Sequence, residues 1–424
     1  MHYFEYKNGQ LYAEDIAVAQ LVQEYGTPLY IYSASTLTRH FTAFDSAFAG
    51  IPHLTCYSVK ANSNLSFLKL LAEQGAGTDI VSGGELFRAL RAGVDRKKIV
   101  YSGVGKKDIE IREALLADIL MFNVESTQEL KRINAIAGDM GMCARISLRI
   151  NPDVDPKTHP YISTGMKENK FGLSRRKALE VYALAQSLPH VDPIGMDCHI
   201  GSQLTTLAPF LEALERLKAL YRQLQDMGIQ IKYLDLGGGL GITYNEEEPP
   251  HPKELGTALV NALRGYDITL ILEPGRVIAG NTGILVTEVQ YTKRTEDKDF
   301  VIVDAAMNDL VRPSLYGSYH HISPIVERQG PSFVADVVGP VCESSDFLAK
   351  NRTLPQVRQG DVLAVFSAGA YGFTMSSQYN SRPRAAEVMV QGSQHVLIRK
   401  REVYQDLVAL EEEGLSRIQE LRES

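Results

Sequence analysis

Lys60 stands where a lysine can act as a nucleophile. It follows the apolar run 54–59 and precedes Ala-Asn-Ser-Asn, a pattern typical of a strand that ends in a turn. Seven more strand-like runs follow. Other residues able to do chemistry stand at the ends of these runs: Asp79, Ser82, Ser102, Asn123, Glu125, Asn151, His199, Ser202, Gly237, Gly238, Gly239, Glu273 and Arg276. If the runs are parallel strands of one barrel, their ends meet at one mouth, and an amine there favours a carbonyl cofactor held as a Schiff base.

The chemistry of Lys60 depends on its surroundings. A lysine buried among apolar neighbours and cationic groups loses proton affinity and can condense with an aldehyde. The alternative is a lysine that faces solvent, which is the usual environment of this residue. Lys60 alone does not decide between the two.

A glycine-rich segment, Gly237-Gly-Gly-Leu-Gly241, follows the seventh run. Glycines there let backbone N–H groups close around an anion, and phosphate sites after strands seven and eight recur in (β/α)₈ barrels. Ile242 and Tyr244 stand where G-x-G-x-x-G would need its third glycine, so a dinucleotide is disfavoured. A plain tight turn is the alternative interpretation.

The eighth run ends in Glu273-Pro-Gly-Arg276. Pro274 keeps Glu273 extended, so we expect its carboxylate to point along the mouth. A carboxylate in that place can hold a pyridine nitrogen protonated, which makes a pyridoxal ring an effective electron sink. Arg276 offers a planar fork for a phosphate or a substrate carboxylate. A Glu–Arg ion pair that braces the strand end is the alternative.

Three other residues fit such a site. His199, in Cys198-His-Ile-Gly-Ser-Gln203, is able to stack on a cofactor ring, although a histidine satisfied within the core is the commoner outcome. Cys342 and Tyr371 follow apolar runs beyond residue 276. Cys342 is either a small buried residue or, if its pKa is low, a reactive thiol.

Apolar runs alternate with helical patterns between residues 35 and 276. The expected strands cover 54–59, 78–82, 98–102, 119–124, 143–150, 193–200, 231–236 and 268–273. They show little polar alternation, as expected of parallel strands buried on both faces. Eight strands with their helices in about 240 residues predict a TIM-like (β/α)₈ barrel, which typically takes about 250 residues. An open doubly wound sheet is the alternative, but it would more often carry a dinucleotide fingerprint.

Helix boundaries between these strands carry their own signals. Ser82-Gly-Gly-Glu85 and Ser126-Thr-Gln-Glu129 have the pattern of capping boxes that open a helix. Gly75 and Gly93 stand where helices should stop. A helix before the first strand should bury the face formed by Leu37, Phe41, Phe44 and Phe48.

After residue 276 strands follow one another, separated by Gly, Pro and charged turns. They are expected at 283–293, 299–304, 332–338, 362–367, 385–391 and 395–400, with a helix at about 403–422. This order predicts a mostly antiparallel β domain. We expect the run 28–32 to pair with it. The barrel then covers 35–276, and the β domain covers 1–34 and 277–424.

The overall composition is that of a soluble globular protein. The 424 residues suggest two or three domains, with 44% hydrophobic and 22% charged residues. A net charge of −7 gives no general attraction to nucleic acid or anionic lipid. The start shows no signal peptide, and no run is long enough to span a membrane. Four cysteines without paired spacing, three of them in apolar runs, indicate reduced thiols and a cytoplasmic protein.

Together the motifs resemble the fold-type III pyridoxal-phosphate decarboxylases, whose fold is like that of alanine racemase. The resemblance rests on YSVKAN (57–62), CHIGSQ (198–203), LGGGLGI (236–242), EPGR (273–276), CESSD (342–346) and GAYG (369–372). Three more segments narrow it to the diaminopimelate decarboxylases: INPDVDPKTHPYISTGMKENKFG (150–172), VDAAMNDLVRPSLY (303–316) and SSQYNSRPR (376–384). The resemblance covers nearly the whole chain, with the motifs in order.

Carried over position by position, the resemblance implies a role for each cofactor-binding residue. Lys60 would hold pyridoxal 5′-phosphate as a Schiff base, His199 would stack on its ring, and Glu273 would pair with the pyridine nitrogen. Further cofactor contacts would come from Asp79, Ser202, Gly237, Gly238, Gly239, Gly275, Arg276 and Tyr371. The loop 237–239, Ser202 and the backbone near Gly275 would hold the phosphate.

The resemblance also implies a substrate site that two subunits share. Arg276, Arg312, Tyr316, Glu343 and Tyr371 would bind the substrate, with the arginines and Tyr316 on its distal carboxylate and Glu343 on its distal ammonium. Cys342 would protonate the carbanion after CO₂ leaves. In this family the cysteine and the glutamate come from the partner subunit, which implies a head-to-tail homodimer. The implied reaction is decarboxylation of meso-2,6-diaminopimelate at its D-configured end to L-lysine and CO₂, the last step of lysine biosynthesis.

Three other functions fit these residues less well. A decarboxylase of the same fold for ornithine or arginine has no use for two guanidiniums at a distal ammonium, which Arg276 and Arg312 would supply. A catalytically dead regulator would not need Lys60, Glu273 and Cys342 together. A racemase shares the fold, but its motifs do not match.

Overall fold

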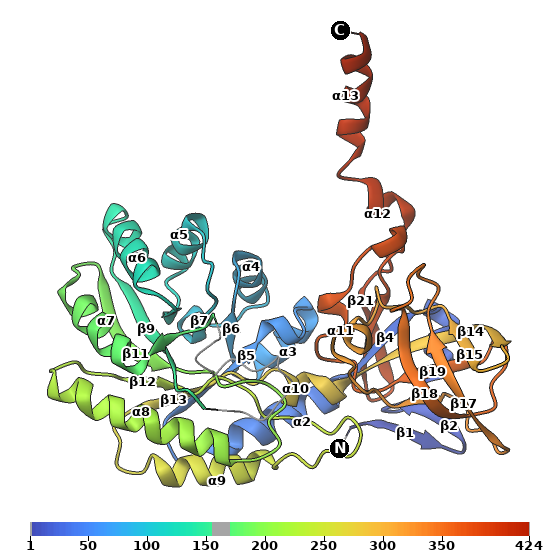
Figure 1. Ribbon diagram of the computed structural model, residues 1–424, viewed down its shortest axis with the longest axis horizontal. Helices are drawn as coiled ribbons and strands as arrows, with labels where there is room; N and C mark the ends of the chain where they lie inside the picture. Colours follow the sequence, from blue (N-terminus) through green and yellow to red (C-terminus); the bar gives the residue numbers. More distant parts are fainter. Residues whose placement is uncertain (1, 155–169, 424) are drawn as a thin grey trace. The chain divides into compact units, whose positions relative to one another are not determined.

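The computed structural model describes residues 2–154 and 170–423 (Figure 1). The chain forms two compact units. One is Leu37–Gly280, and the other combines Met1–Thr36 with Asn281–Ser424. Residues 155–169, which include most of the motif at 150–172, lie outside the described residues.

The unit Leu37–Gly280 is a parallel barrel, as predicted from the sequence. Its strands in chain order are β5 (His53–Ser58), β6 (Gly77–Ile80), β7 (Ile99–Tyr101), β8 (Met121–Val124), β9 (Ala144–Asn151), β11 (Val191–Asp197), β12 (Tyr233–Asp235) and β13 (Thr269–Leu272). All eight expected strands are present. Parallel pairing of β8 with β9 and of β13 with β5 closes the barrel. A short extra strand, β10 (Leu173–Ser174), pairs with β9.

Helices lie around the outside of these strands (Figure 1). They are α2 (Ala34–Asp45), α3 (Leu65–Glu73), α4 (Gly83–Arg91), α5 (Asp108–Ala117), α6 (Thr127–Asp139), α7 (Arg175–Ser187), α8 (Ala208–Asp226), α9 (Pro252–Ala262) and α10 (Arg276–Ala279). The predicted apolar face before the first strand is confirmed, because Leu37, Phe41, Phe44 and Phe48 are all buried. Barrel strands covered in this way are apolar on both faces.

Helices α4 and α6 begin at the predicted residues, but their caps differ in detail from a capping box. The hydroxyls of Ser82 and Ser126 accept hydrogen bonds from the N–H groups of Glu85 and Glu129, as a serine N-cap does. Each glutamate, however, reaches one residue further back than expected. Glu85 accepts the N–H of Val81, so its carboxylate ties the preceding loop to the helix.

Apolar side chains fill the inside of the barrel. One cluster joins Cys56, Val100, Leu120, Met121, Ile194 and Ile271. Cys56 and Cys198 are buried, as expected of small hydrophobic residues. The expectation was wrong for Cys143, which is exposed because it lies in the turn just before β9. Cys342 is also exposed.

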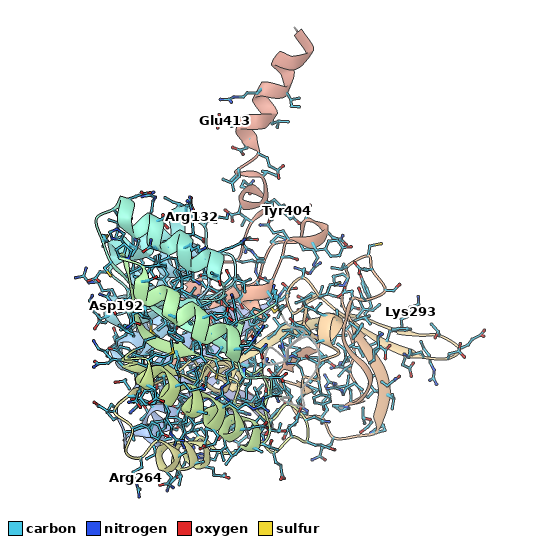
Figure 2. The ribbon with its side chains drawn as sticks, turned by 60° about the vertical axis from the view of Figure 1, so that its left-hand side comes forward. Arg132, Asp192, Arg264, Lys293, Tyr404 and Glu413 are labelled. Carbon is cyan, nitrogen blue, oxygen red and sulfur yellow. The ribbon has the colours of Figure 1, made fainter. Side chains whose placement is uncertain are left out.

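The second unit is built on a mixed, mostly antiparallel sheet. The order of its main strands is β18 (Phe347–Pro355), β17 (Ser332–Val338), β15 (Asp299–Val303), β14 (Gly283–Arg294), β4 (Leu29–Ser33), β20 (Ala386–Gln391) and β21 (Gln394–Arg399), with β19 (Val362–Val365) and β16 (Ile322–Pro324) alongside. As expected, β4 joins this sheet, antiparallel to β14 and parallel to β20. The far half of β14 leaves the core, and Figure 2 labels Lys293 near the tip of its hairpin with β15.

Several elements of this unit were not predicted. They include β1 (Phe4–Lys7), β2 (Gln10–Ala13), β3 (Ile16–Ala17), α1 (Val18–Tyr25), β16, β18 and α11 (Arg312–Tyr316). Asn8 and Gly9 join β1 to β2 with positive φ angles of 51° and 74°, the turn that an Asn-Gly pair favours. The sequence therefore held a signal for this hairpin. The expected C-terminal helix is divided into α12 (Tyr404–Val408) and α13 (Glu412–Glu423).

No helix within residues 2–154 and 170–423 is both long enough and apolar enough to cross a membrane.

Candidate active site

Lys60 lies directly after β5, in the short helical turn η2 (Val59–Ala61). Its Nζ donates a hydrogen bond of 2.5 Å to Oδ2 of Asp79, and its side chain is 38% exposed. The functional interpretation of Lys60 assumed apolar and cationic neighbours, but the structure places a carboxylate beside this amine. The nearest charged partner is a carboxylate, because β5 and β6 are adjacent and Ser58 is in register with Asp79.

Asp79 is fully buried on β6. Burial alone would raise the pKa of Asp79, but the positive charge of Lys60 and hydrogen bonds from Lys60, Ser58 and Ser102 hold it below its usual value. The hydroxyl of Ser58, which has one hydrogen to donate, lies 2.9 Å from Oδ2 of Asp79 and 3.0 Å from the carbonyl oxygen of Glu273. Oδ1 of Asp79 is buried with no hydrogen-bond partner among the described residues.

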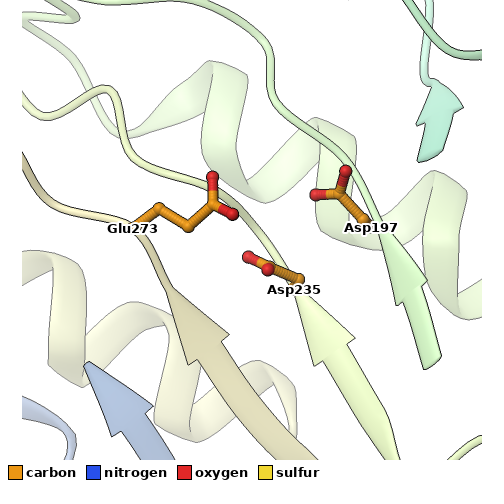
Figure 3. Close-up of side chains that lie close together, drawn as sticks. All are labelled: Asp197, Asp235 and Glu273. Atoms are coloured by element: carbon orange, nitrogen blue, oxygen red, sulfur yellow. The ribbon is translucent and has the colours of Figure 1, made fainter. Parts of the chain in front are cut away.

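Three buried carboxylates meet at the ends of neighbouring strands (Figure 3). Asp197 ends β11, Asp235 ends β12, and Glu273 follows β13. One oxygen of each lies within 4.8 Å of the others. Burial, together with the other carboxylates, raises the pKa of Glu273 and of Asp197 well above the ordinary values, and burial raises that of Asp235 to about 6. Burial and the neighbouring carboxylates therefore favour the protonated form of Glu273.

Amide and hydroxyl groups connect this cluster to the neighbouring strands. Nδ2 of Asn123, on β8, lies 3.4 Å from Oδ2 of Asp235 and 3.4 Å from Oε1 of Glu273. Ser147 fixes the orientation of that amide by donating 2.5 Å to its Oδ1. Ser102 donates 3.3 Å to Glu273. Side chains from five of the eight strand ends thus form one hydrogen-bonded layer around Glu273.

Arg149 supplies positive charge beside the carboxylates. Its Nη1 donates 2.8 Å to Oε1 of Glu125, and its Nε lies 3.8 Å from Oδ2 of Asp197. The guanidinium is buried with them, which makes the pair strong in a low-dielectric setting. Nevertheless the positive charge of Arg149 does not bring the pKa of Asp197 down to its ordinary range.

Carboxylates at this spacing could also coordinate a metal ion. The ions that prefer oxygen ligands need deprotonated carboxylates. The raised pKa values of Asp197 and Glu273 favour protons in these places. A cation bound here would have to displace the protons that burial favours on Asp197 and Glu273.

The glycine loop after β12 packs directly against the neighbouring strand ends. A Cβ at Gly238 would lie 2.2 Å from the carbonyl oxygen of Glu273, and one at Gly237 would lie 2.6 Å from Nδ1 of His199. A Cβ at Gly239 would lie 2.6 Å from the carbonyl oxygen of Gly201. Each of these positions therefore requires glycine for a steric reason beyond the turn itself.

His199 follows β11 and faces this loop. Its Nδ1 accepts the N–H of Gly238 at 3.2 Å. Burial and the positive charges of Arg149 and Lys60 lower its pKa to about 3. The imidazole is therefore neutral, and the proton on the ring sits on Nε2. A neutral, oriented ring is suited to stacking against a planar cofactor.

Arg276 opens α10 directly after Gly275 and is buried. Its Nε and Nη2 donate to Oγ of Ser202 at 3.3 and 3.0 Å, and its Nη1 donates to the hydroxyl of Tyr244 at 2.7 Å. The expected alternative, an ion pair with Glu273, is not the contact seen. Ser202 was predicted as a phosphate ligand, and in this structure its hydroxyl accepts from Arg276.

The second unit brings together three of its predicted site residues. The guanidinium carbon of Arg312, at the start of α11, lies 5.7 Å from the ring centre of Tyr316 and 6.0 Å from that of Tyr371. Arg312 is buried, and its Nη2 donates 3.2 Å to Ser318. Tyr371 has a left-handed backbone with φ 56°, a conformation that non-glycine residues adopt mainly where the surroundings impose it.

Cys342 and Glu343 lie together in one exposed turn of the same unit. The N–H of Cys342 donates 3.0 Å to Oδ1 of Asn380. Ser345 and Tyr379 donate to the carboxylate of Glu343 and lower its pKa. An exposed carboxylate that stays ionised suits recognition of a cation.

The groups of the barrel fit pyridoxal phosphate. They offer an amine, an acid with a raised pKa, a neutral imidazole, and a closely packed loop that tolerates only glycine. The buried Oδ1 of Asp79 leaves one further acceptor beside the amine. This set matches the chemistry that the cofactor requires of its protein.

Sequence reasoning missed Asp197 and Asp235, and it listed Asn123 without a partner. Both aspartates stand inside runs that were judged to be buried strands. A charged residue in such a run is costly unless it is paired or protonated. That rule would have singled them out. From the sequence, Tyr244 counted only as a residue that stands where a dinucleotide-binding motif would need glycine.

Comparisons with known proteins agree with this chemistry. Residues 34–280 match the family described as pyridoxal-dependent decarboxylase, pyridoxal binding domain. The chain is 57% identical over 413 residues to a diaminopimelate decarboxylase of Vibrio cholerae, covering 97% of this chain and 99% of that protein. It is 53% identical over 409 residues to the diaminopimelate decarboxylase of Pseudomonas aeruginosa, covering 96% and 98%. The crystal structure of diaminopimelate decarboxylase from Helicobacter pylori complexed with L-lysine matches with a TM-score of 0.91 at 47% identity, covering 93% of this chain and 99% of that one.

Proposed function

This chain belongs to the diaminopimelate decarboxylase family, and we propose on that basis that it converts meso-2,6-diaminopimelate to L-lysine and CO₂, the last step of lysine biosynthesis. It is a lyase that depends on pyridoxal 5′-phosphate. The bound cofactor supplies an electron sink for the bond to CO₂ as it breaks. Binding, orientation and proton transfer are left to the residues of the chain.

Lys60 is the residue that binds the cofactor covalently. Asp79 fixes the position of its amine through the 2.5 Å hydrogen bond, and Ser58 in turn fixes Asp79. With substrate bound, Asp79 would hold the free amine of Lys60 close to the cofactor, where it would be available again for product release.

Glu273 would pair with the ring nitrogen of the cofactor. Burial, with Asp235, Asp79 and Asp197, raises the pKa of Glu273 and so favours sharing of a proton with that nitrogen. Asn123 and Ser102 hold the carboxyl group in place. His199 would stack against the face of the ring.

Backbone groups of Gly237, Gly238 and Gly239, with Ser202 and the backbone at Gly275, hold the phosphate. The glycine loop supports this role, because its close packing against His199 and Glu273 leaves no room for side chains. Ser202 would add a hydroxyl to the backbone groups around the phosphate, whereas the N–H groups of Gly237 and Gly238 donate to Asp235 and His199 in this structure.

Arg276, Arg312 and Tyr316 bind the distal carboxylate of the substrate, Glu343 binds its distal ammonium, and Tyr371 lies against cofactor and substrate. Two guanidiniums suit a carboxylate because each can donate two parallel hydrogen bonds. This end of the substrate is the part that diaminopimelate has and that ornithine lacks. A site built to bind a carboxylate rejects analogues without one.

Cys342 donates the proton that replaces CO₂. We place Cys342 and Glu343 in the active site of the partner subunit, so that the enzyme works as a head-to-tail homodimer. Their exposure on a turn supports this assignment, since both are accessible to another chain. A cytoplasmic location fits a biosynthetic enzyme whose four cysteines are free.

The observation that carries this proposal is the pair of Lys60 with the buried Asp79, joined by Ser58 to the strand end that bears Glu273. An amine and a proton-bearing acid on adjacent strands are what a pyridoxal enzyme needs at the two ends of its ring.

Reduction of the holoenzyme with borohydride, followed by peptide mass spectrometry, tests the assignment of Lys60. The pyridoxyl group should be found on Lys60, and Lys60→Ala should lose both the visible absorbance of the bound cofactor and turnover. Lys69→Ala is the matched control, since Lys69 is an exposed lysine on α3 of the same unit. A pyridoxyl group on another lysine, or full absorbance in Lys60→Ala, would overturn the assignment.

A further inference from the structure

Two hydroxyl groups hold the guanidinium of Arg276 from different directions. Ser202 accepts from Nε and Nη2, and Tyr244 accepts from Nη1 at 2.7 Å. The guanidinium carbon also lies 5.7 Å from the ring centre of Tyr244. Contacts at both ends of a planar group restrict its rotation about the Cδ–Nε bond, so the plane of Arg276 is set before any ligand arrives.

Tyr244 is itself fixed by a turn built around one carboxylate. The backbone N–H groups of Tyr244 and Asn245 both donate to Oε2 of Glu247, at 2.9 and 2.7 Å. The hydroxyl of Thr243 donates 2.8 Å to the carbonyl of Glu247. Although this segment is acidic and surface-exposed in part, the turn gives Tyr244 one backbone position.

The loops that carry the two hydroxyls are joined to each other. Gln203, next to Ser202, donates 2.6 Å to the carbonyl of Ile242 and accepts from its N–H at 3.2 Å. Leu204 donates 2.9 Å to the carbonyl of Gly239 and accepts from the N–H of Gly241 at 3.0 Å. Four hydrogen bonds therefore tie the loop after β11 to the loop after β12, which limits changes in the separation of the two acceptors.

We infer that Tyr244 is a positioning residue for substrate recognition, holding Arg276 in the orientation that binds the distal carboxylate of diaminopimelate. This inference rests on the proposed role of Arg276. Tyr244 acts through Arg276 and takes no part in breaking the bond to CO₂. Its loss should weaken binding of any ligand with that carboxylate and leave the chemical step unchanged.

The product offers a direct probe of this effect. CO₂ leaves from the end of the substrate bound to the cofactor, so L-lysine keeps the carboxylate that Arg276 binds. 1,5-Diaminopentane is L-lysine without that carboxylate. The ratio of their inhibition constants therefore measures how well the carboxylate is recognised, independently of turnover.

The test compares Tyr244→Phe with the wild-type holoenzyme. Removing a hydrogen bond to a charged group should raise KM for diaminopimelate and Ki for L-lysine about fivefold to tenfold. We expect kcat, cofactor absorbance and Ki for 1,5-diaminopentane to stay within about twofold. Glu247→Gln, which weakens the turn and keeps the phenol, should move KM and Ki for L-lysine in the same direction by less.

Tyr266→Phe is the matched control. Tyr266 accepts a hydrogen bond of 2.8 Å from Arg222 on the outer helix α8, so it repeats the Tyr–Arg contact away from the strand ends. Its kinetics and ligand binding should equal those of the wild type.

Arg276→Met separates failure of this inference from failure of the proposed function. If Arg276→Met raises both constants and Tyr244→Phe changes neither, the role of Tyr244 is wrong and the clamp stands. If Arg276→Met changes neither, the clamp itself is wrong, and the inference falls with it. A Tyr244→Phe variant that weakens L-lysine and 1,5-diaminopentane equally, or that loses cofactor, also overturns the inference.

Discussion

Asp79, beside the reactive amine, and Glu273, at a nearby strand end, are both buried. Their pKa values shift in opposite directions. Asp79 keeps a low pKa because the charge of Lys60 and hydrogen bonds from Lys60, Ser58 and Ser102 compensate its negative charge. Glu273 is equally buried but has other carboxylates as neighbours, so its proton is retained. Residues of the same chemical type thus take different protonation states within one layer of side chains.

Glu273→Gln tests whether the proton matters. Glutamine keeps the size of the side chain and its contacts with Asn123 and Ser102, but it cannot share a proton with the ring nitrogen. We expect kcat to fall by roughly 10²- to 10³-fold while the cofactor remains bound. Steady-state kinetics at saturating substrate, with cofactor content from visible absorbance, provide the measurement.

Infrared spectra give a second readout for the same residue. Cofactor-free wild type at neutral pH should show the carbonyl band of a buried protonated carboxyl group, and Glu273→Gln should lose part of it. The exposed Glu215 on α8 serves as the control site for Glu215→Gln. A kcat within threefold of the wild type would argue against Glu273 as the partner of the ring nitrogen.

In helix α9, packing reverses the usual preference of a helix interior for alanine over glycine. Gly256 lies inside this helix, where a glycine usually costs about 0.5–1 kcal/mol relative to alanine. A Cβ at this position, however, would lie 2.2 Å from the carbonyl oxygen of Ala47 in η1 (Ser46–Phe48). The glycine allows α9 to approach the end of α2 closely.

Gly256→Ala should therefore destabilise the barrel by about 1–3 kcal/mol, the usual cost of overpacking, in spite of the better helix former. Gly84→Ala is the matched control, because Gly84 is exposed in the first turn of α4 and its Cβ would meet only Ser82 Oγ, at 3.8 Å. That variant should be unchanged or more stable by up to about 1 kcal/mol. Urea unfolding followed by circular dichroism gives both values, and equal stability of the two variants would refute the packing argument.

At the scale of the whole molecule, the proposed sharing of active sites predicts rescue between inactive variants. Lys60→Ala and Cys342→Ala should each be severely impaired. If Cys342 serves the partner subunit, a mixed dimer holds one site with both native residues. An equal mixture that exchanges subunits should then recover about a quarter of the wild-type activity, since half of the dimers are mixed and each has one intact site.

A second mixture checks the origin of any recovery. Lys60→Ala and Glu273→Gln both alter the barrel of their own chain. Every active site in their mixed dimers therefore lacks either Lys60 or Glu273, and activity should stay low. Sedimentation of the samples shows whether dimers form. Recovery in neither mixture, with dimers present, would mean that each chain builds its site alone.

Much of this protein was determined by local sequence. Eight apolar runs with helix signals between them predicted the barrel because parallel strands buried on both faces have few polar positions. Lys60, His199, Glu273 and Arg276 were found from their places after such runs, since strand ends of one barrel must share a face. The Asn8-Gly9 hairpin was readable too, but it was missed.

Only the tertiary structure decided what those residues contact. The pairing of Lys60 with Asp79, the cluster of three carboxylates, and the contacts of Ser202 and Tyr244 with Arg276 join residues from 19 to 76 positions apart in sequence. Protonation and orientation depend on the burial and charge of all neighbours at once. The sequence of a strand fixes the position of a residue along that strand. The neighbours of its side chain across the barrel depend on how the sheet closes.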